Sequence, residues 1–498
     1  MRLSLYIGLV AVFWALSILI LQAGKKQNPF ADFSSPPSAP EAQEQIKQAF
    51  LHAWKGYSKY AWGKDELCSL TKSGNNWMYM GSTIVDSLSS LWLLGLQNEF
   101  QNATEWVEKY LTFNSSNTFT SFFEVNIRIL GGLISAYELS GQKVFLDKAE
   151  ELGKIMAKAF DSKGFPPSYY NFATGEGNTR KEIRTYSIYG PVYSPGYYSL
   201  AELGTLSLEF SALGHHLNQD HYKYLGSQAI HLILNSFESG IFPNGIYNDL
   251  SHTNTYSVAG EGDSFYEYLV KEYLHTGSKN SELEKAAIDS INDIIEKLLQ
   301  QDVAGYYYLG LIKDGEFISQ MDHLACFFPG TIVLAAERLG FSNKERLITI
   351  AKELAFTCYN MYEQSDSGLA SEIVNLHYGI KYPWFVDNHY ALRPETLESL
   401  WYLYDLTKDN IYREWAWNIF QAIEKHAKND VAYAEIENVN RNPPNQRGCL
   451  PSYFFSETLK YLYMIFSDEE IIDLNTWVLT TEGHPLKIKT DYTNPNLK

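Results

Sequence analysis

Residues 123–140 read FEVNIRILGGLISAYELS, and their pattern decides the fold class. Apolar side chains recur three and four positions apart, which is the spacing of one helix face. Few charges interrupt the stretch, so this helix is apolar on most faces and has to be buried on most sides. Residues 196–213, GYYSLAELGTLSLEFSAL, have the same character. The sequence therefore predicts helices enclosed within a larger helical assembly.

The rest of the chain from about residue 41 is almost wholly helical in pattern. We predict fourteen helices in seven consecutive pairs, at residues 41–61, 83–96, 102–112, 123–140, 145–160, 196–213, 220–236, 262–276, 281–301, 318–339, 343–363, 391–406, 409–425 and 453–467. Short strand-like stretches lie between pairs, at 306–308 and 317–319. An open solenoid would show a sequence repeat, and we detect none. We therefore predict an all-α fold, a closed α/α toroid with one helix of each pair inside and one outside.

Composition restricts the class of ligand. The 498 residues contain 40 Lys and Arg against 58 Asp and Glu, a net charge of −18, and 45% of them are hydrophobic. So much apolar mass buries a large core and excludes general disorder. The acidic balance argues against nucleic acid and favours a neutral or cationic ligand, or a metal. The four cysteines form no CxxC or Cys/His cluster, which argues against a zinc site.

The amino terminus reads as a membrane anchor. Residues 3–22, LSLYIGLVAVFWALSILILQ, carry no charge over a bilayer-spanning length. No good cleavage site follows, so we expect an uncleaved signal anchor within residues 1–24. Residues 25–42, rich in Pro, Ser and Ala, read as a stem, and 43–498 as the lumenal catalytic domain of a single-pass type II protein. N-glycosylation sequons at Asn102 and Asn114 agree with a lumenal position of this domain.

Three carboxylates stand in aromatic surroundings: Glu124, Asp263 and Glu395. Singly, each is explained by a helix cap or an ion pair, such as Glu124 with Arg128 one turn later or Asp263 as an N-cap. Pro394 favours a helix beginning at Glu395. Taken together, the three acids would meet at one end of a toroid. Such a site can hold one acid protonated and another ionised, as glycoside hydrolysis needs.

The carboxyl-terminal segment Thr480-Thr-Glu-Gly-His-Pro485 has two interpretations. A Thr can offer its hydroxyl and carbonyl oxygens to a hard cation such as Ca²⁺. The same residues also form ordinary hydroxyl-capped turns.

Over residues 41–487 the chain resembles glycoside hydrolase family 47, the class I α-1,2-mannosidases of the endoplasmic reticulum and Golgi. The resemblance rests on segments in the family's order, namely 60–67 (YAWGKDEL), 123–124 with 131–132, 200–204 (LAELG), 262–268 (GDSFYEY), 321–324 (MDHL) with 329–330, 393–399 (RPETLES), 457–461 (ETLKY) and 481–485 (TEGHP). It implies an (αα)₇ barrel and a Ca²⁺-dependent, single-step inverting hydrolysis of terminal α-1,2-linked mannose on high-mannose N-glycans. From the resemblance we expect a monomer in the endoplasmic reticulum membrane, or alternatively the Golgi membrane, that can serve endoplasmic-reticulum-associated degradation (ERAD).

The resemblance also implies roles for residues. Glu124 and Asp263 match two candidate acids, between which the sequence does not decide, and Glu395 matches the base that activates water. Inversion needs the acid and base roughly 6.5–9.5 Å apart. Thr481 matches the Ca²⁺ ligand. The expected sugar-binding and water-mediated positions are Arg128, Glu267, His323, Arg393, Glu398, Glu457 and Glu482.

Cys326 and Cys358 match the family's disulfide. Cys68 and Cys449 have no such match, and we expect free thiols there, although they would pair if the last helices close onto the first. Asn126 stands where many members have Thr or Ser, and Gly483 stands where many have Ala.

One further departure bears on specificity. Glu261 stands where endoplasmic reticulum members typically carry Arg and Golgi members Leu, so branch preference and compartment stay open. The competing hypothesis, a non-hydrolytic glycan-binding protein of quality control, would have lost an acid or the Ca²⁺ ligand. All three acids and Thr481 remain.

Overall fold

The computed structural model describes residues 28–114, 116–179, 183–187, 190–194, 196–237 and 240–489. The predicted anchor at 3–22 lies outside these ranges. Within the described ranges, no helix combines the length and apolar character needed to cross a membrane.

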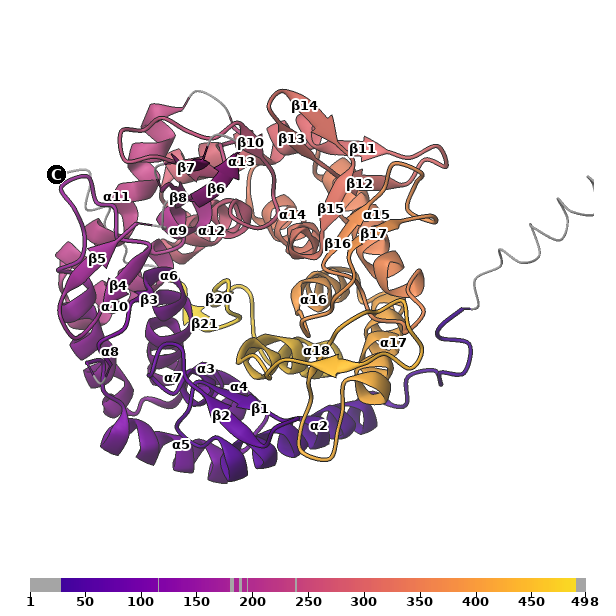
Figure 1. The fold of residues 1–498 in the computed structure, drawn as a ribbon, viewed down its shortest axis with the longest axis horizontal. Helices are drawn as coiled ribbons and strands as arrows, with labels where there is room; N and C mark the ends of the chain where they lie inside the picture. Colours follow the sequence, from indigo (N-terminus) through magenta and orange to yellow (C-terminus); the bar gives the residue numbers. More distant parts are fainter. Residues whose placement is uncertain are drawn as a thin grey trace, which may run out of the picture.

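Two concentric rings of helices form the molecule (Figure 1). The outer ring comprises α2 (Ala39–Tyr60), α5 (Gln97–Tyr110), α8 (Lys143–Met156), α11 (Asp220–Ser236), α13 (Ser281–Lys297), α15 (Lys344–Glu363) and α17 (Ile411–His426). The inner ring comprises α3 (Ser82–Asp86) with α4 (Leu88–Leu93), α6 (Phe122–Glu124) with η1 (Val125–Leu130) and α7 (Gly131–Ser140), α9 (Leu200–Gly204) with α10 (Ser207–Leu217), α12 (Asp263–His275), η2 (His323–Phe327) with α14 (Phe328–Arg338), α16 (Glu395–Thr407), and η3 (Phe454–Thr458) with α18 (Leu459–Ile465). Contact of α18 with α2 closes the ring, which confirms the predicted toroid.

Burial explains which helix faces inward. In α8, Phe145, Ala149 and Leu152 make one buried stripe on an otherwise polar helix, as an outer helix requires. In α12, every residue from Ser264 to His275 is buried. The predicted inner segments, 123–140 and 196–213, do lie in the inner ring.

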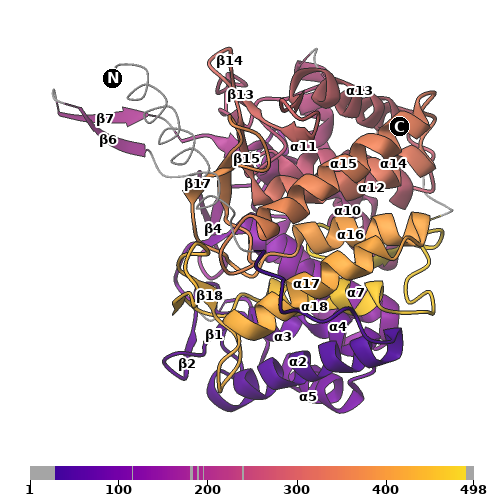
Figure 2. The same ribbon diagram turned by 90° about the vertical axis from the view of Figure 1, so that its right-hand side faces the viewer.

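Short antiparallel sheets, many of them gathered at one end of the barrel, connect the helices (Figure 2). They are β1 (Glu66–Cys68) with β2 (Ser73–Asn75); β3 (Thr120–Ser121), β4 (Tyr169–Asn171) and β5 (Glu176–Asn178); β6 (Ile183–Ser187) with β7 (Gly190–Ser194); β8 (Tyr198–Ser199) with β9 (Gly245–Ile246); β10 (Thr255–Tyr256), β13 (Leu311–Lys313) and β14 (Glu316–Ile318); β11 (Leu299–Gln301) with β12 (Tyr307–Leu309); β15 (Gln320–Asp322), β16 (Ile373–Asn375) and β17 (Trp384–Asp387); β18 (Glu435–Ile436) with β19 (Gln446–Arg447); and β20 (Trp477–Leu479) with β21 (Pro485–Lys487). The predicted strands at 306–308 and 317–319 correspond to β12 and β14.

The β20–β21 hairpin enters the centre of the ring (Figure 1). Its second strand is held by Glu138 of α7, whose side chain is fully buried. Glu138 pairs with the ammonium group of Lys489 and accepts a hydrogen bond from the backbone N–H of Lys487. His216 of α10 approaches the same carboxylate at 2.6 Å. The hairpin is therefore fixed to the inner ring.

Both cysteine pairs are bonded. Cys326 and Cys358 form the predicted disulfide. The expectation of free thiols at Cys68 and Cys449 is wrong, because these residues are disulfide-bonded across 381 positions. Residue 68 follows the first helix and residue 449 precedes the last, so closing the ring brings them together, and Leu67 pairs with Leu450 in a β-bridge beside them.

Residues 28–38, within the predicted stem, lie against the domain. Phe30 is buried and stacks on Tyr359 with ring centroids 5.8 Å apart. Helix α2 begins at Ala39, ahead of the predicted boundary at 43.

Candidate active site

Glu124 occupies a junction between helix types. It ends α6, and its backbone N–H donates to the hydroxyl of Ser121 at 3.3 Å. The π-helix η1 follows, and π-helical segments are frequent at functional sites. The η3 segment that carries Glu457 is also a π-helix. Glu124 therefore directly precedes one locally widened helix turn, and Glu457 lies within another.

Arg128 links Glu124 to the carboxyl-terminal turn. Its Nε donates to Glu124 at 2.6 Å, and its Nη1 contacts Glu482 and lies 3.4 Å from Asp86. Burial alone would lower the pKa of Arg128, but the charges of Glu124, Glu482 and Asp86 raise it well above its usual range. The predicted simple ion pair with Glu124 is real, and it belongs to a larger buried network.

Asp263 is the first residue of α12, and Gly262 takes the N-cap position that the sequence suggested for Asp263. The Oδ1 atom accepts a hydrogen bond from the next backbone N–H, of Ser264, at 2.9 Å. Burial, followed by the charges of Asp322 and Glu267, raises the pKa of Asp263 to about 7. Such a carboxyl can retain a proton near neutrality, as a general acid must.

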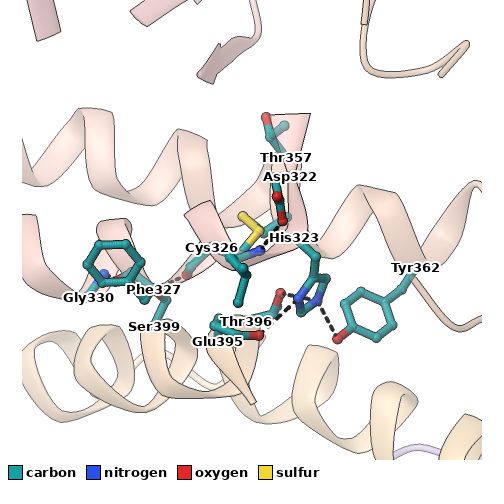
Figure 3. Close-up of a disulfide and its surroundings, with 12 residues drawn as sticks. Asp322, His323, Cys326, Phe327, Gly330, Thr357, Tyr362, Glu395, Thr396 and Ser399 are labelled. Carbon is teal, nitrogen blue, oxygen red and sulfur yellow. Dashed lines mark hydrogen bonds and ion pairs between the residues drawn. A yellow bond between two sulfur atoms is a disulfide. The ribbon is translucent and has the colours of Figure 1, made fainter. Parts of the chain in front are cut away.

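Glu395 begins α16, as Pro394 predicted. Its Oε2 lies 3.1 Å from Nδ1 of His323, and Oε1 lies 3.9 Å from the Arg393 guanidinium. The other nitrogen of His323 lies 2.9 Å from the Tyr362 hydroxyl, so the imidazole is fixed at both ends (Figure 3). A carboxyl so oriented is placed to accept a proton from water.

The predicted disulfide supports this arrangement. Cys326 lies in η2 three residues after His323, and its carbonyl accepts a hydrogen bond from Ser399 of the Glu395 helix at 2.5 Å (Figure 3). The bond to Cys358 ties the same turn to α15. The disulfide therefore fixes the turn that holds His323 against Glu395.

Four further acids form a cluster in the barrel interior: Glu267, Glu398, Glu457 and Glu482. Lys271, fully buried, pairs with Glu267 and lies 3.4 Å from Glu398. Burial, despite Lys271, raises the pKa of Glu398 to about 8. Burial and then the charge of Glu482 raise the pKa of Glu457 well above its usual range. The interior therefore holds more negative charge than its own cations neutralise.

Thr481 has the chemistry of a cation ligand. It lies in the turn between β20 and β21, where its N–H donates weakly to the hydroxyl of Tyr268 at 3.5 Å. Within the described residues, neither its hydroxyl nor its carbonyl oxygen makes a hydrogen bond, and the Glu457 carboxyl also has no donor. These oxygens fit Ca²⁺, which prefers neutral and anionic oxygen ligands. In the part of the chain that the structure describes, no group of three His, Cys, Asp or Glu side chains is placed to hold a metal ion.

Every candidate residue from the sequence belongs to this connected set, through a hydrogen bond, an ion pair, or a charge that shifts the pKa of a neighbour. The sequence reasoning missed Asp86, Lys271, Lys460 and His484, which are all buried. Asp86 lies 3.0 Å from the His484 ring. Lys460 is a lone cation among apolar residues, in the segment LKYLYMIF from 459 to 466, but the sequence does not show what these four residues contact.

A closed double ring of helices encloses several acids, and burial raises the pKa values of Asp263, Glu398 and Glu457. Such a site can support the acid and base catalysis by which glycosidic bonds are hydrolysed. A family model, glycosyl hydrolase family 47, matches residues 49–488, and the chain belongs to that family. It is a glycoside hydrolase.

Relatives cover nearly the whole chain. A mannosyl-oligosaccharide 1,2-alpha-mannosidase of Arabidopsis thaliana is 36% identical, covering 94% of this chain and 83% of the relative. An endoplasmic reticulum mannosyl-oligosaccharide 1,2-alpha-mannosidase of Rattus norvegicus is 37% identical, covering 91% and 69%. The solved alpha-1,2-mannosidase from Trichoderma reesei is similar with a TM-score of 0.82 and 25% identity, covering 92% of this chain and all of that one.

Proposed function

We propose that this protein removes terminal α-1,2-linked mannose from high-mannose N-glycans by inverting hydrolysis. The observation that carries the proposal is the pairing, within one coupled cluster, of Asp263, whose pKa is raised to about 7, with Glu395, fixed by His323. The names of the relatives from Arabidopsis thaliana and Rattus norvegicus supply the linkage and the glycan class.

In the proposed reaction, Glu395 takes a proton from the attacking water while an acid protonates the departing glycosidic oxygen. Asp263 and Glu124 are the candidate acids. Asp263 retains its proton near neutrality, and Glu124 would act through water beside Arg128. Inversion follows because the base and the acid act on opposite faces of the sugar in one step.

Thr481 would hold Ca²⁺ through its hydroxyl and carbonyl oxygens, with Glu267, Glu398, Glu457 and Glu482 acting through water. Bound Ca²⁺ supplies coordination to sugar hydroxyls. Arg393, held by Glu372 at 2.6 Å, would bind the glycan from beside Glu395.

The proposed setting is the lumen of the endoplasmic reticulum, or alternatively of the Golgi, with a monomeric domain anchored through residues 3–22. The endoplasmic reticulum name of the rat relative supports the first. Glu261 stands at the position where other members carry Arg or Leu and which bears on branch preference. Its side chain accepts a hydrogen bond from the Tyr197 hydroxyl at 3.2 Å.

The test is incubation of the full-length protein in detergent with a nine-mannose N-glycan, with Ca²⁺ or with EDTA. We expect free mannose only with Ca²⁺. Glu395→Gln should abolish release, whereas Glu414→Gln, the same change at an exposed position of α17, should not. Absence of mannose from the wild type with Ca²⁺, together with intact glycan binding, would favour the non-hydrolytic alternative.

A further inference from the structure

The turn that carries Thr481 is held by a buried lysine outside the reaction centre. Lys460 of α18 is fully buried, and its Nζ donates to the carbonyl oxygen of Gly483 at 2.6 Å and to the Ser89 hydroxyl at 3.0 Å. A buried ammonium is costly unless its protons are used, so these contacts fix where the turn lies. The candidate mechanism uses none of these three residues.

The contacts continue from Ser89 into the site. The Ser89 hydroxyl lies 3.1 Å from Nδ1 of His484, and Nε2 of that ring lies 3.0 Å from Asp86. Asp86 lies 3.4 Å from Arg128, which pairs with Glu124. The anchor of the turn and a candidate acid are thus joined by a continuous series of close polar contacts.

Inside the turn, Thr480 closes the backbone around the next residue. Its hydroxyl accepts from the N–H groups of Glu482 and His484 at 3.3 and 3.2 Å, and its carbonyl accepts from Gly483 at 2.9 Å. Gly483 has φ +68°, and an added Cβ would lie 3.1 Å from the Ser456 carbonyl oxygen. Within this turn, as far as the described residues go, Thr481 alone has both its side-chain and carbonyl oxygens unbonded.

We propose that Lys460 is a positioning residue for a divalent cation. By holding Gly483 and, through Ser89, His484, it sets the turn so that the hydroxyl and carbonyl oxygens of Thr481 point together at one ion. The inference rests on the proposed Ca²⁺ site and adds to it a residue that touches neither the ion nor the sugar.

The charge of Lys460 makes the test decisive, because two explanations predict opposite signs. If Lys460 acted only as a charge near Glu457 and Glu482, its removal would reduce repulsion and tighten Ca²⁺ binding. If it positions the turn, removal leaves the Gly483 carbonyl buried without a partner, and the turn shifts. Loss of groups that orient metal ligands weakens affinity by about 10–100-fold.

The experiment uses the full-length protein in detergent, stripped with EDTA and titrated with Ca²⁺ by calorimetry, and compares wild type, Lys460→Met, Ser89→Ala and Lys148→Met. Methionine keeps the length of the lysine stem without its charge. We expect the Ca²⁺ Kd of Lys460→Met to rise about tenfold or more. Ser89→Ala, a smaller deletion, should raise Kd less and in the same direction. Lys148→Met is the matched control, because Lys148 of α8 also donates to a backbone carbonyl, that of Leu111 at 2.7 Å, but lies outside the hairpin, so Kd should not change.

Mannose release at saturating Ca²⁺ completes the comparison. At saturating Ca²⁺ we expect the kcat of Lys460→Met to equal that of wild type. The variant should differ only in needing a higher Ca²⁺ concentration to reach this rate. An unchanged or lower Kd in both Lys460→Met and Ser89→Ala, with wild type binding Ca²⁺ and releasing mannose, would overturn the inference and leave the function standing. A wild type that neither binds Ca²⁺ nor releases mannose would overturn both.

Discussion

The half-buried Asp263 and the buried Glu138 have carboxyl pKa values that move in opposite directions, so exchanging each for its amide should change stability with opposite signs. Burial raises the pKa of Asp263 from its ordinary 3.8 to about 7. The folded protein then keeps a proton that the unfolded chain loses between pH 4 and 7, so stability falls across that window. Three pKa units correspond to about 4 kcal/mol above pH 7, as an upper value because Asp263 is only partly buried. Asp263→Asn has no proton to lose and avoids that cost.

Glu138 gives the mirror case. Burial alone would raise its pKa, but His216 and Lys489 outweigh burial and lower it from 4.5 to about 2. The stability from this shift is present above about pH 4.5 and is lost as the pH falls toward 2. It amounts to about 3 kcal/mol, which Glu138→Gln should forfeit at neutral pH.

The assay is thermal unfolding in EDTA, so that no cation alters the acid cluster, at pH 4, 6 and 8. Unfolding entropy for a chain of this size is about 1 kcal/mol/K, so each kcal/mol moves Tm by about 1 °C. Asp263→Asn should match wild type at pH 4 and exceed it by up to about 4 °C at pH 8, while Glu138→Gln should melt about 3 °C lower at pH 6 and 8. If Asp263→Asn changed Tm equally at pH 4 and 8, the reasoning from burial would be refuted. Retained turnover in that variant would assign the acid role to Glu124.

Three further outcomes follow from the site and the covalent links. Thr481→Ala should weaken Ca²⁺ binding and remove the rise in Tm that Ca²⁺ gives wild type. That rise reflects a stabilisation of about 2.7 kcal/mol at 100 times Kd, and an equal Ca²⁺-dependent rise in both proteins would contradict the assignment. Cys68→Ser should lower stability in denaturant by about 4 kcal/mol or more, since the bond to Cys449 closes a long loop, and retention of wild-type stability would show that ring packing alone joins the ends. His323→Ala should reduce kcat more than KM because the imidazole orients Glu395, which initial rates over a range of glycan concentrations measure; a change in KM alone would place His323 in sugar binding instead.

Helical periodicity predicted the two rings of helices, because each helix buries its apolar face. It could not predict where the residues of the candidate site interrupt these helices. The helix predicted at 318–339 contains β15 and η2 before α14, since Asp322 and His323 turn the chain toward Glu395. The helix predicted at 391–406 begins at Glu395, because Leu392 has φ +62° and leaves the helical conformation. Apart from the stretches predicted at 306–308 and 317–319, the described strands of two to five residues have too little pattern to be predicted from sequence.

The candidate site, like the fold, was predicted only in part from the sequence. The acids were found because segments such as GDSFYEY and RPETLES resemble a family, whereas Asp86 and Lys460 required knowledge of which helices meet. Lys460 follows Glu457 by three residues, a spacing that also fits a simple ion pair on one helix. Its contacts instead reach Ser89, 371 positions away, through the closure of the ring. No local pattern encodes such a partner.

Closure of the ring also explains why the acids of the site lie in an electrostatically unfavourable cluster. The apolar faces of the inner helices bring their acids together, and burial then raises the pKa values of Asp263, Glu398 and Glu457. An acid cluster of this kind lowers stability unless protons or a cation neutralise it. Lys271 pairs with Glu267 and Arg128 with Glu482, whereas Lys460 donates to the Gly483 carbonyl and Glu457 is left without a donor in the part of the chain described. The local rule that buried charge must be paired is therefore broken beside Thr481, at the place where a bound cation and a sugar would complete it.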